Sequence, residues 1–362
     1  MNKVRILVLA ILFFLLVTPV TAKRTPRMYY TFHFGDNICS TFDIATQTRT
    51  QIPDCPRKVD YRGWDGWNGP PGPYDGGVVE YNARIYLANG TYYDTGNSMW
   101  SIFADKATDI YKFDNKMYLF GGKDGHLKRF RVYDPETETT TELGKLFSLH
   151  VASSIKLNDN SGIFSVITNQ YFIYIYHFDT VSETWSELVA YDSNYGEKTY
   201  SAVYHNGIIY MMMNSGYTFH SYDVISKSWV TQKPSDMSAG KLTVYNGDIY
   251  SITPESSVYR YDTGVSAWIK LNSWAETKSS SRRIFCEGPD VIIDSSPASL
   301  ISLQDMTNTD LGDVSSPLGK NRLFSGAARI LYNNMVYMFG ETYLISVPEK
   351  KRRRGPSLGC SK

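Results

Sequence analysis

An aspartate preceded by an aromatic residue recurs along this chain at near-constant intervals. Six such aspartates and a seventh, Asp305, which follows Gln304, lie at positions 43, 94, 134, 179, 223, 262 and 305, with separations of 51, 40, 45, 44, 39 and 43 residues. In four copies a tryptophan follows six residues later: Asp94 with Trp100, Asp179 with Trp185, Asp223 with Trp229, and Asp262 with Trp268. Weaker copies replace the tryptophan: Asp43 with Arg49, Asp134 with Thr140, and Asp305 with Leu311. A period of about 40 residues predicts one small structural unit per repeat.

Each unit also contains a turn followed by a short apolar strand. These segments span residues 82–87, 114–122, 160–166, 206–212, 246–252, 288–293 and 333–340. Asn-Gly at 206–207 and 246–247 is typical of a two-residue hairpin, because both residues must adopt positive φ. The chain has 28 Tyr against 17 Phe, and its aromatic content of 14% favours strands over helices. Each repeat is therefore predicted to be four short antiparallel strands.

Such a sheet cannot bury both of its faces alone, so the repeats must pack face to face around an axis. The sequence predicts an all-β propeller of seven blades, or six if one weak copy is an insertion. The repeated Trp and Tyr are expected to fill the space between blades, and each Asp to fasten its own turn. Residues 28–52 and 326–347 each hold part of a repeat, and we expect them to close the ring as one shared blade.

The best copy of the repeat resembles the kelch family. It runs from Asp114 to Gly122, with the sequence DNKMYLFGG, and continues as Val132-Tyr133-Asp134-Pro135. The glycine pair is altered elsewhere, as at Asn89-Gly90. The resemblance covers residues 28–347 and implies a kelch-type propeller that serves as a protein-interaction platform. Intracellular relatives carry BTB or similar domains, which this chain lacks, so their cullin-adaptor and actin roles are not implied.

The first 22 residues predict export. Lys3 and Arg5 precede an apolar run, and Ala22 ends a small-residue site for a signal peptidase. A signal anchor is the alternative, although the run is short for a bilayer span. We expect a secreted, extracellular protein with no transmembrane segment after cleavage, beginning with a short segment at 23–27.

Charge is distributed unevenly. The net charge is +1 overall, but without the signal and the tail the body carries about −7. An acidic body argues against nucleic acid as a partner. The tail, residues 348–362, is predicted to be disordered, and five of its basic residues could bind a polyanion or form a processing site: Lys350, Lys351, Arg352, Arg353 and Arg354.

Four cysteines and one sequon have predicted modifications. Cys39 with Cys55, and Cys286 with Cys360, are the preferred disulfide pairs in an oxidising compartment, while a buried free thiol at Cys286 is the alternative. Asn89 begins the sequence Asn-Gly-Thr in a predicted exposed turn, and we expect it to carry an N-linked glycan in a eukaryotic host.

The long first interval contains a Pro-, Gly- and aromatic-rich segment, residues 53–77. Its side chains suit a carbohydrate or a peptide, and the candidate binding residues are Tyr61, Arg62, Trp64, Asp65, Trp67 and Tyr74. A plug that packs over one end of the propeller is the alternative. The six histidines show no paired spacing of a zinc site, so neither a metal nor a cofactor is predicted.

The leading functional expectation is a non-enzymatic secreted scaffold that holds an extracellular protein or glycan on a propeller face. One alternative is a Tyr-rich structural component of an extracellular matrix, retained by its basic tail. Another is a propeller enzyme acting on carbohydrate, because secreted kelch propellers include galactose oxidases and a sialic-acid epimerase. The chain lacks the additional domains and the copper ligand pattern of the oxidases, and no catalytic residue is predicted.

Overall fold

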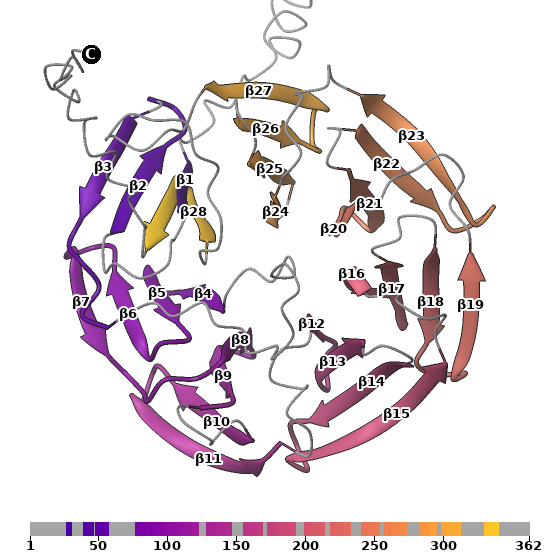
Figure 1. Cartoon of the computed structure of the whole chain (residues 1–362), viewed down its shortest axis with the longest axis horizontal. Coiled ribbons are helices and arrows are strands. Elements are labelled where there is room, and N and C mark those ends of the chain that lie inside the picture. Colours follow the sequence, from indigo (N-terminus) through magenta and orange to yellow (C-terminus); the bar gives the residue numbers. More distant parts are fainter. Residues whose placement is uncertain are drawn as a thin grey trace, which may run out of the picture.

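The chain folds into a ring of seven blades, a β-propeller (Figure 1). This computed structural model describes residues 27–30, 39–46, 48–57, 77–122, 128–146, 155–168, 172–192, 199–213, 218–232, 240–253, 257–273, 283–287, 289–294, 298–312 and 329–339. Every regular element in these ranges is a strand. The predicted all-β propeller is confirmed, and its blade number is seven.

Six blades are four-stranded antiparallel sheets whose strands follow one another from the axis to the rim. Blades 1 and 2 comprise β4 (Val78–Tyr81), β5 (Arg84–Leu87), β6 (Thr91–Asp94), β7 (Met99–Ile102), β8 (Asp109–Phe113), β9 (Lys116–Phe120), β10 (Arg129–Asp134) and β11 (Thr139–Lys145). Blades 3 and 4 comprise β12 (Ile155–Asn158), β13 (Gly162–Thr168), β14 (Phe172–Asp179), β15 (Thr184–Asp192), β16 (Thr199–His205), β17 (Ile208–Met213), β18 (Phe219–Asp223) and β19 (Ser228–Gln232). Blades 5 and 6 comprise β20 (Lys241–Tyr245), β21 (Asp248–Ile252), β22 (Ser257–Asp262), β23 (Ala267–Ser273), β24 (Arg283–Glu287), β25 (Asp290–Asp294), β26 (Ala298–Ser302) and β27 (Thr307–Gly312).

The seventh, closing blade joins the two ends of the chain, as the sequence predicts. Strand β28 (Arg329–Phe339) pairs antiparallel with β2 (Cys39–Asp43) and parallel with β1 (Arg27–Tyr30). Strand β3 (Thr48–Ile52) lies outside β2 and completes the blade (Figure 1). The sequence predicts a turn at the start of the segment 333–340, whereas the structure has one strand that passes through Asn333 at φ +49°.

The hydrophobic core lies between the blades. Six of the seven interfaces contain a cluster of buried side chains among the described residues, each drawn from two consecutive blades. Between blades 2 and 3, the ring of Phe130 lies 4.7 Å from that of Phe178 and 5.5 Å from that of Trp185, centroid to centroid. Such edge and tilted contacts add about 0.5–1.5 kcal/mol each to the burial of the rings.

The four repeated tryptophans occupy equivalent places on the outer strands. Each stands opposite the aromatic residue that precedes the repeated Asp, with ring centroids 5.0–5.2 Å apart; the pairs are Tyr93–Trp100, Phe178–Trp185, Tyr222–Trp229 and Tyr261–Trp268. Each of these aromatic pairs packs into the hydrophobic cluster between its own blade and the preceding one. The tryptophan therefore covers the rim of that interface.

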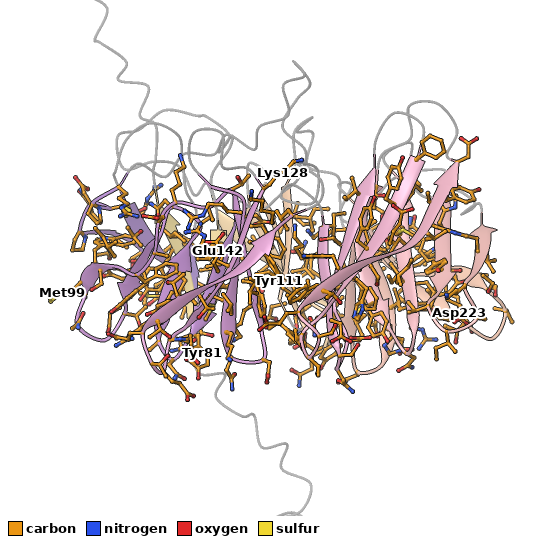
Figure 2. The ribbon with its side chains drawn as sticks, turned by 90° about the horizontal axis from the view of Figure 1, so that it is seen from below. Tyr81, Met99, Tyr111, Lys128, Glu142 and Asp223 are labelled. Atoms are coloured by element: carbon orange, nitrogen blue, oxygen red, sulfur yellow. The ribbon has the colours of Figure 1, made fainter. Side chains whose placement is uncertain are left out.

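The repeated aspartates organise the turns between the third and fourth strands. One Oδ1 accepts the amides of the second and third residues that follow, at 2.7–3.3 Å, in Asp43, Asp94, Asp134, Asp179, Asp223 and Asp262. In the five of these turns where the structure describes it, the residue four positions after the Asp takes a positive φ of 53–59°, as in Ser98 and Glu138. These turns share one face of the ring with the hairpins that follow the innermost strands, and Figure 2 shows Tyr81 and Asp223 there, with Lys128 toward the opposite face.

The seventh copy of this turn is displaced by three residues from its predicted place. The sequence places it at Asp305, but β26 ends at Ser302, which pairs with Thr307, and Met306 takes the positive φ. Ser302 therefore occupies the position of the repeated Asp. Asp305 instead accepts the Thr307 hydroxyl at 2.7 Å, within the turn.

Two-residue hairpins with positive φ recur after the innermost strands. The Asn-Gly pairs at 206–207 and 246–247 have this geometry, and so do Asn82-Ala83 and Asp114-Asn115. Ala83 adopts φ +61°, where its Cβ is crowded by the backbone. The residues that take a positive φ in the turns between the third and fourth strands, by contrast, are mostly polar.

Replacing Ala83 with glycine should stabilise the protein. The left-handed conformation costs alanine more than glycine, and after the extra entropy of the unfolded glycine chain we expect a net gain of about 0.5 kcal/mol in the free energy of unfolding. Denaturant titration measures it. Ala267→Gly is the matched control, since Ala267 is exposed in β23 without a positive φ, and it should lose about 0.5–1 kcal/mol. Equal losses in both variants would contradict the strain at Ala83.

The Asp turns should also make stability depend on pH below about 4. Backbone amides of Ser182 and Val181 lower the pKa of Asp179, and the amide of Ser226 lowers that of Asp223. Their contribution is therefore complete above the unfolded pKa of about 3.9 and is lost as the pH falls through the folded pKa.

The double variant Asp179→Asn, Asp223→Asn keeps the oxygen acceptors but removes the charge. Thermal unfolding from pH 7 to pH 2 should show a lower Tm than the unmodified protein at pH 7 and a smaller further loss below pH 4. The two curves should approach each other as the pH falls through the folded pKa values of the two carboxyls. Parallel curves over the whole range would contradict the role of these two charges.

Candidate functional site

All of the predicted binding residues lie outside the described part of the chain. They are Tyr61, Arg62, Trp64, Asp65, Trp67 and Tyr74 together with the basic tail residues, and the predicted signal segment also lies outside it. Of the segment 53–77, the structure describes residues 53–57 and Gly77. Its described start runs from the closing blade to blade 1, where the Trp100 indole donates to the Pro53 carbonyl at 2.8 Å.

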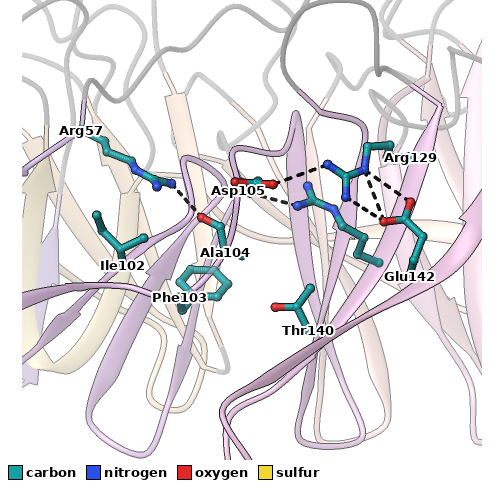
Figure 3. Close-up of a pocket in the computed structure, with 9 residues that line it drawn as sticks. Arg57, Ile102, Phe103, Ala104, Asp105, Arg129, Thr140 and Glu142 are labelled. Atoms are coloured by element: carbon teal, nitrogen blue, oxygen red, sulfur yellow. Dashed lines mark hydrogen bonds and ion pairs between the residues drawn. The ribbon is translucent and has the colours of Figure 1, made fainter.

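A pocket of about 440 Å³ opens beside this start, at the rim between blades 1 and 2 (Figure 3). Its lining comes from the closing-blade extension, the β7–β8 connection and strands β10 and β11: Arg57, Ile102, Phe103, Ala104, Asp105, Arg129, Arg131, Thr140 and Glu142. Three guanidinium groups therefore share it with two carboxylates. The size is within the range of small-ligand sites in proteins.

The outer part of the pocket contains an ion-pair network. Arg129 donates to Glu142 through Nη2 at 2.8 Å and through Nε at 3.3 Å, and its Nη1 lies 3.6 Å from Asp105 Oδ2 (Figure 3). The hydrogen bond to Glu142 raises the pKa of Arg129 further above its usual range. All three side chains are partly exposed, so the network orients the arginine more than it stabilises the fold.

The other two arginines donate to backbone carbonyls. Arg131, 2% exposed, donates to the carbonyls of Asp105, Lys106 and Gly121 at 3.2–3.3 Å, while its Nε is buried without an acceptor in the described structure. Burial lowers the pKa of Arg131, and the charge of Arg129 lowers it further. Arg57 Nη1 donates to the carbonyls of Asn89 at 3.1 Å and Ala104 at 2.7 Å. Neither of these two guanidinium groups donates a hydrogen bond to a carboxylate in the described structure.

The sequence did not point to this pocket. Arg129 and Arg131 alternate along one strand, which is a weak signal, and Arg57 comes from a different blade. A register shift between Phe130 and Arg131, with Gly144 at φ +113°, sets Glu142 opposite Arg131 and within reach of Arg129. Such a bulge re-aims side chains in a way that alternation does not reveal.

The predicted glycosylation sequon forms a buried clasp next to the pocket. Asn89 is 5% exposed, so the expectation of an exposed turn is wrong. Its Oδ1 accepts the Thr91 amide at 3.1 Å and the Thr91 hydroxyl at 2.6 Å, and its Nδ2 donates to Arg57 O and Cys55 Sγ. Gly90 has φ +82°, and a Cβ there would lie 2.1 Å from the Ala104 carbonyl. A glycan on Nδ2 would require this clasp, residues 55–57 and 89–91, to open.

Two of the predicted disulfide cysteines meet in one cluster. Cys39 and Cys55 are both fully buried together with Ile52 and Tyr337, and the structure carries each as a thiol. Burial raises the pKa of Cys55, and its sulfur contacts Asn89 and the Thr91 hydroxyl. The pairing stays a prediction, as does that of Cys286, whose side chain is outside the description, with Cys360.

A buried ion pair links blades 2 and 3 and was not predicted. Lys156 Nζ lies 3.3 Å from Asp109 Oδ2 and 4.4 Å from the centroid of the Phe120 ring. Burial raises the pKa of Asp109 and lowers that of Lys156, and the attraction between the two groups opposes both shifts. The pair fixes the innermost strands β8 and β12 side by side, which is a structural role.

Neither a metal cluster nor a membrane span is found in the part of the chain that the structure describes. No three His, Cys, Asp or Glu side chains there are grouped to hold a metal ion. No helix in the same ranges is long and apolar enough to cross a bilayer.

The fold and the pocket define a seven-bladed β-propeller with an arginine-rich site at its rim. No protein-family model matches the chain, and no curated protein sequence gives a significant match.

Replacing Asn89 with alanine should destabilise the propeller. It removes the acceptor of the Thr91 amide and hydroxyl in a buried site, which predicts a loss of about 1–3 kcal/mol in the free energy of unfolding by denaturant titration. Asn97→Ala is the control on an exposed turn of the same blade, where the side chain accepts only the Met99 amide, and it should lose less than about 1 kcal/mol. Similar losses in both variants, or a glycan on Asn89 of the folded secreted protein by mass spectrometry, would contradict the clasp.

Proposed function

We propose that this protein is a secreted, non-enzymatic binding scaffold of the kelch type that holds an extracellular protein or glycan. The observation that carries the proposal is the rim pocket, where side chains from the closing blade and blades 1 and 2 converge. Propeller loops and rims present such residues on a scaffold that moves little, which suits recognition.

The chemistry of the pocket supports binding over catalysis. Arginine remains protonated in proteins and does not serve as a general base. The carboxylate of Glu142 is held by Arg129 at 2.8 Å, and the Asp105 carboxylate lies within 3.6 Å of the same guanidinium. Charges that are fixed in this way orient and hold a partner's groups.

Export and the kelch resemblance belong to the same proposal. The predicted signal segment, residues 1–22, supports secretion, and the motif at 114–122 and 132–135 supports the family. A Cys39–Cys55 disulfide would form before the cluster closes, because burial raises the pKa of Cys55 and so suppresses its reactive thiolate. Glycosylation of Asn89 is not part of the proposal, since its amide nitrogen is used by the clasp.

Arrays of extracellular proteins and of glycans test the proposal. The secreted mature protein should bind saturably to at least one array member, and Arg129→Glu should weaken that binding about tenfold or more. Arg260→Glu is the matched control, because Arg260 is a partly exposed, ion-paired arginine on blade 5, away from the pocket. It should leave the binding unchanged.

A second variant tests the aromatic residues of the segment 53–77 separately from the pocket. Trp64→Ala with Trp67→Ala should weaken the same binding if that segment covers the bound partner. Absence of saturable binding on both arrays would overturn the proposed function, and equal loss in Arg129→Glu and Arg260→Glu would remove the pocket from it.

A further inference from the structure

The rim pocket has two chemically different walls (Figure 3). One wall, from blade 2, carries the guanidinium groups of Arg129 and Arg131, while Arg57 lies on the side of Ile102 (Figure 3). The other is the apolar run Ile102, Phe103 and Ala104 at the end of β7. A ligand that fills the pocket meets positive charge and apolar surface within one small volume.

The cationic wall lacks a full complement of anions. Arg129 has two carboxylate neighbours, whereas the hydrogen bonds of Arg57 and Arg131 end on backbone carbonyls. Arg131 is buried and its Nε has no acceptor in the described structure. Since three guanidinium groups share the pocket with two carboxylates, a ligand carboxylate there would be favoured by charge and by hydrogen bonding.

The apolar wall is exposed at Ile102, while Phe103 and Ala104 pack against the buried cluster between blades 1 and 2. Ile102 is 58% exposed although it is aliphatic, and it ends the outermost strand of blade 1. Burial of a side chain of this size contributes about 1.5–3 kcal/mol. A ligand with an aliphatic group next to its acid would therefore use both walls.

The two acids at the edge of the pocket select against a dense polyanion. Glu142 and Asp105 stand beside Arg129, so a chain of sulfates would meet repulsion as well as attraction. A single carboxylate followed by peptide N–H groups avoids this conflict, because Glu142 and Asp105 can accept hydrogen bonds from those groups. The outer edges of β7 and β11 also have no partner strand within their sheets, which leaves room for an extended segment.

We propose that the rim pocket binds an extended acidic peptide of an extracellular protein, with one Asp or Glu next to an aliphatic residue. The acid contacts Arg129, and the aliphatic side chain covers Ile102. This inference rests on the proposed function and names the chemistry of the partner.

A selection on a random library of 12-residue peptides provides the probe. Three matched, fluorescein-labelled forms of the selected peptide are then synthesised to test the inference. The first retains the selected acid and aliphatic pair, the second has the acid replaced by its amide, and the third has the aliphatic residue replaced by serine. Fluorescence anisotropy with the full mature protein should show a Kd at least tenfold weaker for the second and third peptides. The selection itself should enrich an acid beside Leu, Ile or Val.

Variants of the protein locate the contact. Arg129→Ala and Ile102→Ser should each weaken the first peptide about tenfold, and the amide peptide should be insensitive to Arg129→Ala. Arg260→Ala and Val265→Ser are the controls, because they make the same replacements on blade 5, where Val265 is exposed. Unchanged thermal unfolding of all four variants shows that a loss of binding is not a loss of fold.

Three results would overturn the inference. The selection could yield no acidic peptides, the pocket variants could bind the first peptide as the controls do, or a sulfated oligosaccharide could bind with Arg129-dependent affinity while the peptide does not. The last result would leave the proposed function standing with a glycan as its partner. Failure on the protein and glycan arrays would overturn both.

Discussion

The pairing of β28 with β2 is the contact on which the rest of the molecule depends. It joins residues 329–339 to residues 39–43, almost the full length of the chain apart, and without it the sheets would form an open arc with two unpaired edges. Both the clasp at Asn89 and the pocket at Arg57 use the segment 53–57, which packs with the closing blade against blade 1.

Two kinds of interaction stabilise the blades: burial of side chains between blades and hydrogen bonds within the turns. Aromatic and aliphatic clusters between blades supply the non-directional attraction that brings sheets together. The Asp turns supply direction, because one carboxylate oxygen orders two amides and sets the residue that takes positive φ. Blade 6 keeps this turn geometry with Ser302 in place of the Asp, so the turn does not require an aspartate at that position. The repeat is consequently stronger than any one of its copies.

The rim between blades 1 and 2 differs from the other interfaces because a third segment enters it. Arg57 reaches over Gly90, which has no Cβ to obstruct it, and donates to two carbonyls of blade 1. The same segment brings a positive charge next to Arg129 and Arg131 of blade 2. A local departure from the repeat thus produces a cationic pocket on a body whose net charge is negative, and this contrast is the basis of the proposed recognition of an acid.

The sequence by itself determined the propeller, its turns and its closure, because each depends on a local pattern that repeats: an Asp after an aromatic residue, an Asn-Gly hairpin, a tryptophan six residues on. It misplaced the turn at Asp305, where the local pattern is weak, and took the Asn89 sequon for an exposed turn. Burial of Asn89 follows from a neighbour 34 residues away in the sequence, Cys55, and no local pattern records that contact. The pocket likewise needed the tertiary structure, because a bulge in β11 and the path of the closing blade bring together arginines that are more than 70 residues apart. Local patterns that recur along the chain specify the blades, whereas only the packing of the closed ring decides which side chains meet between them.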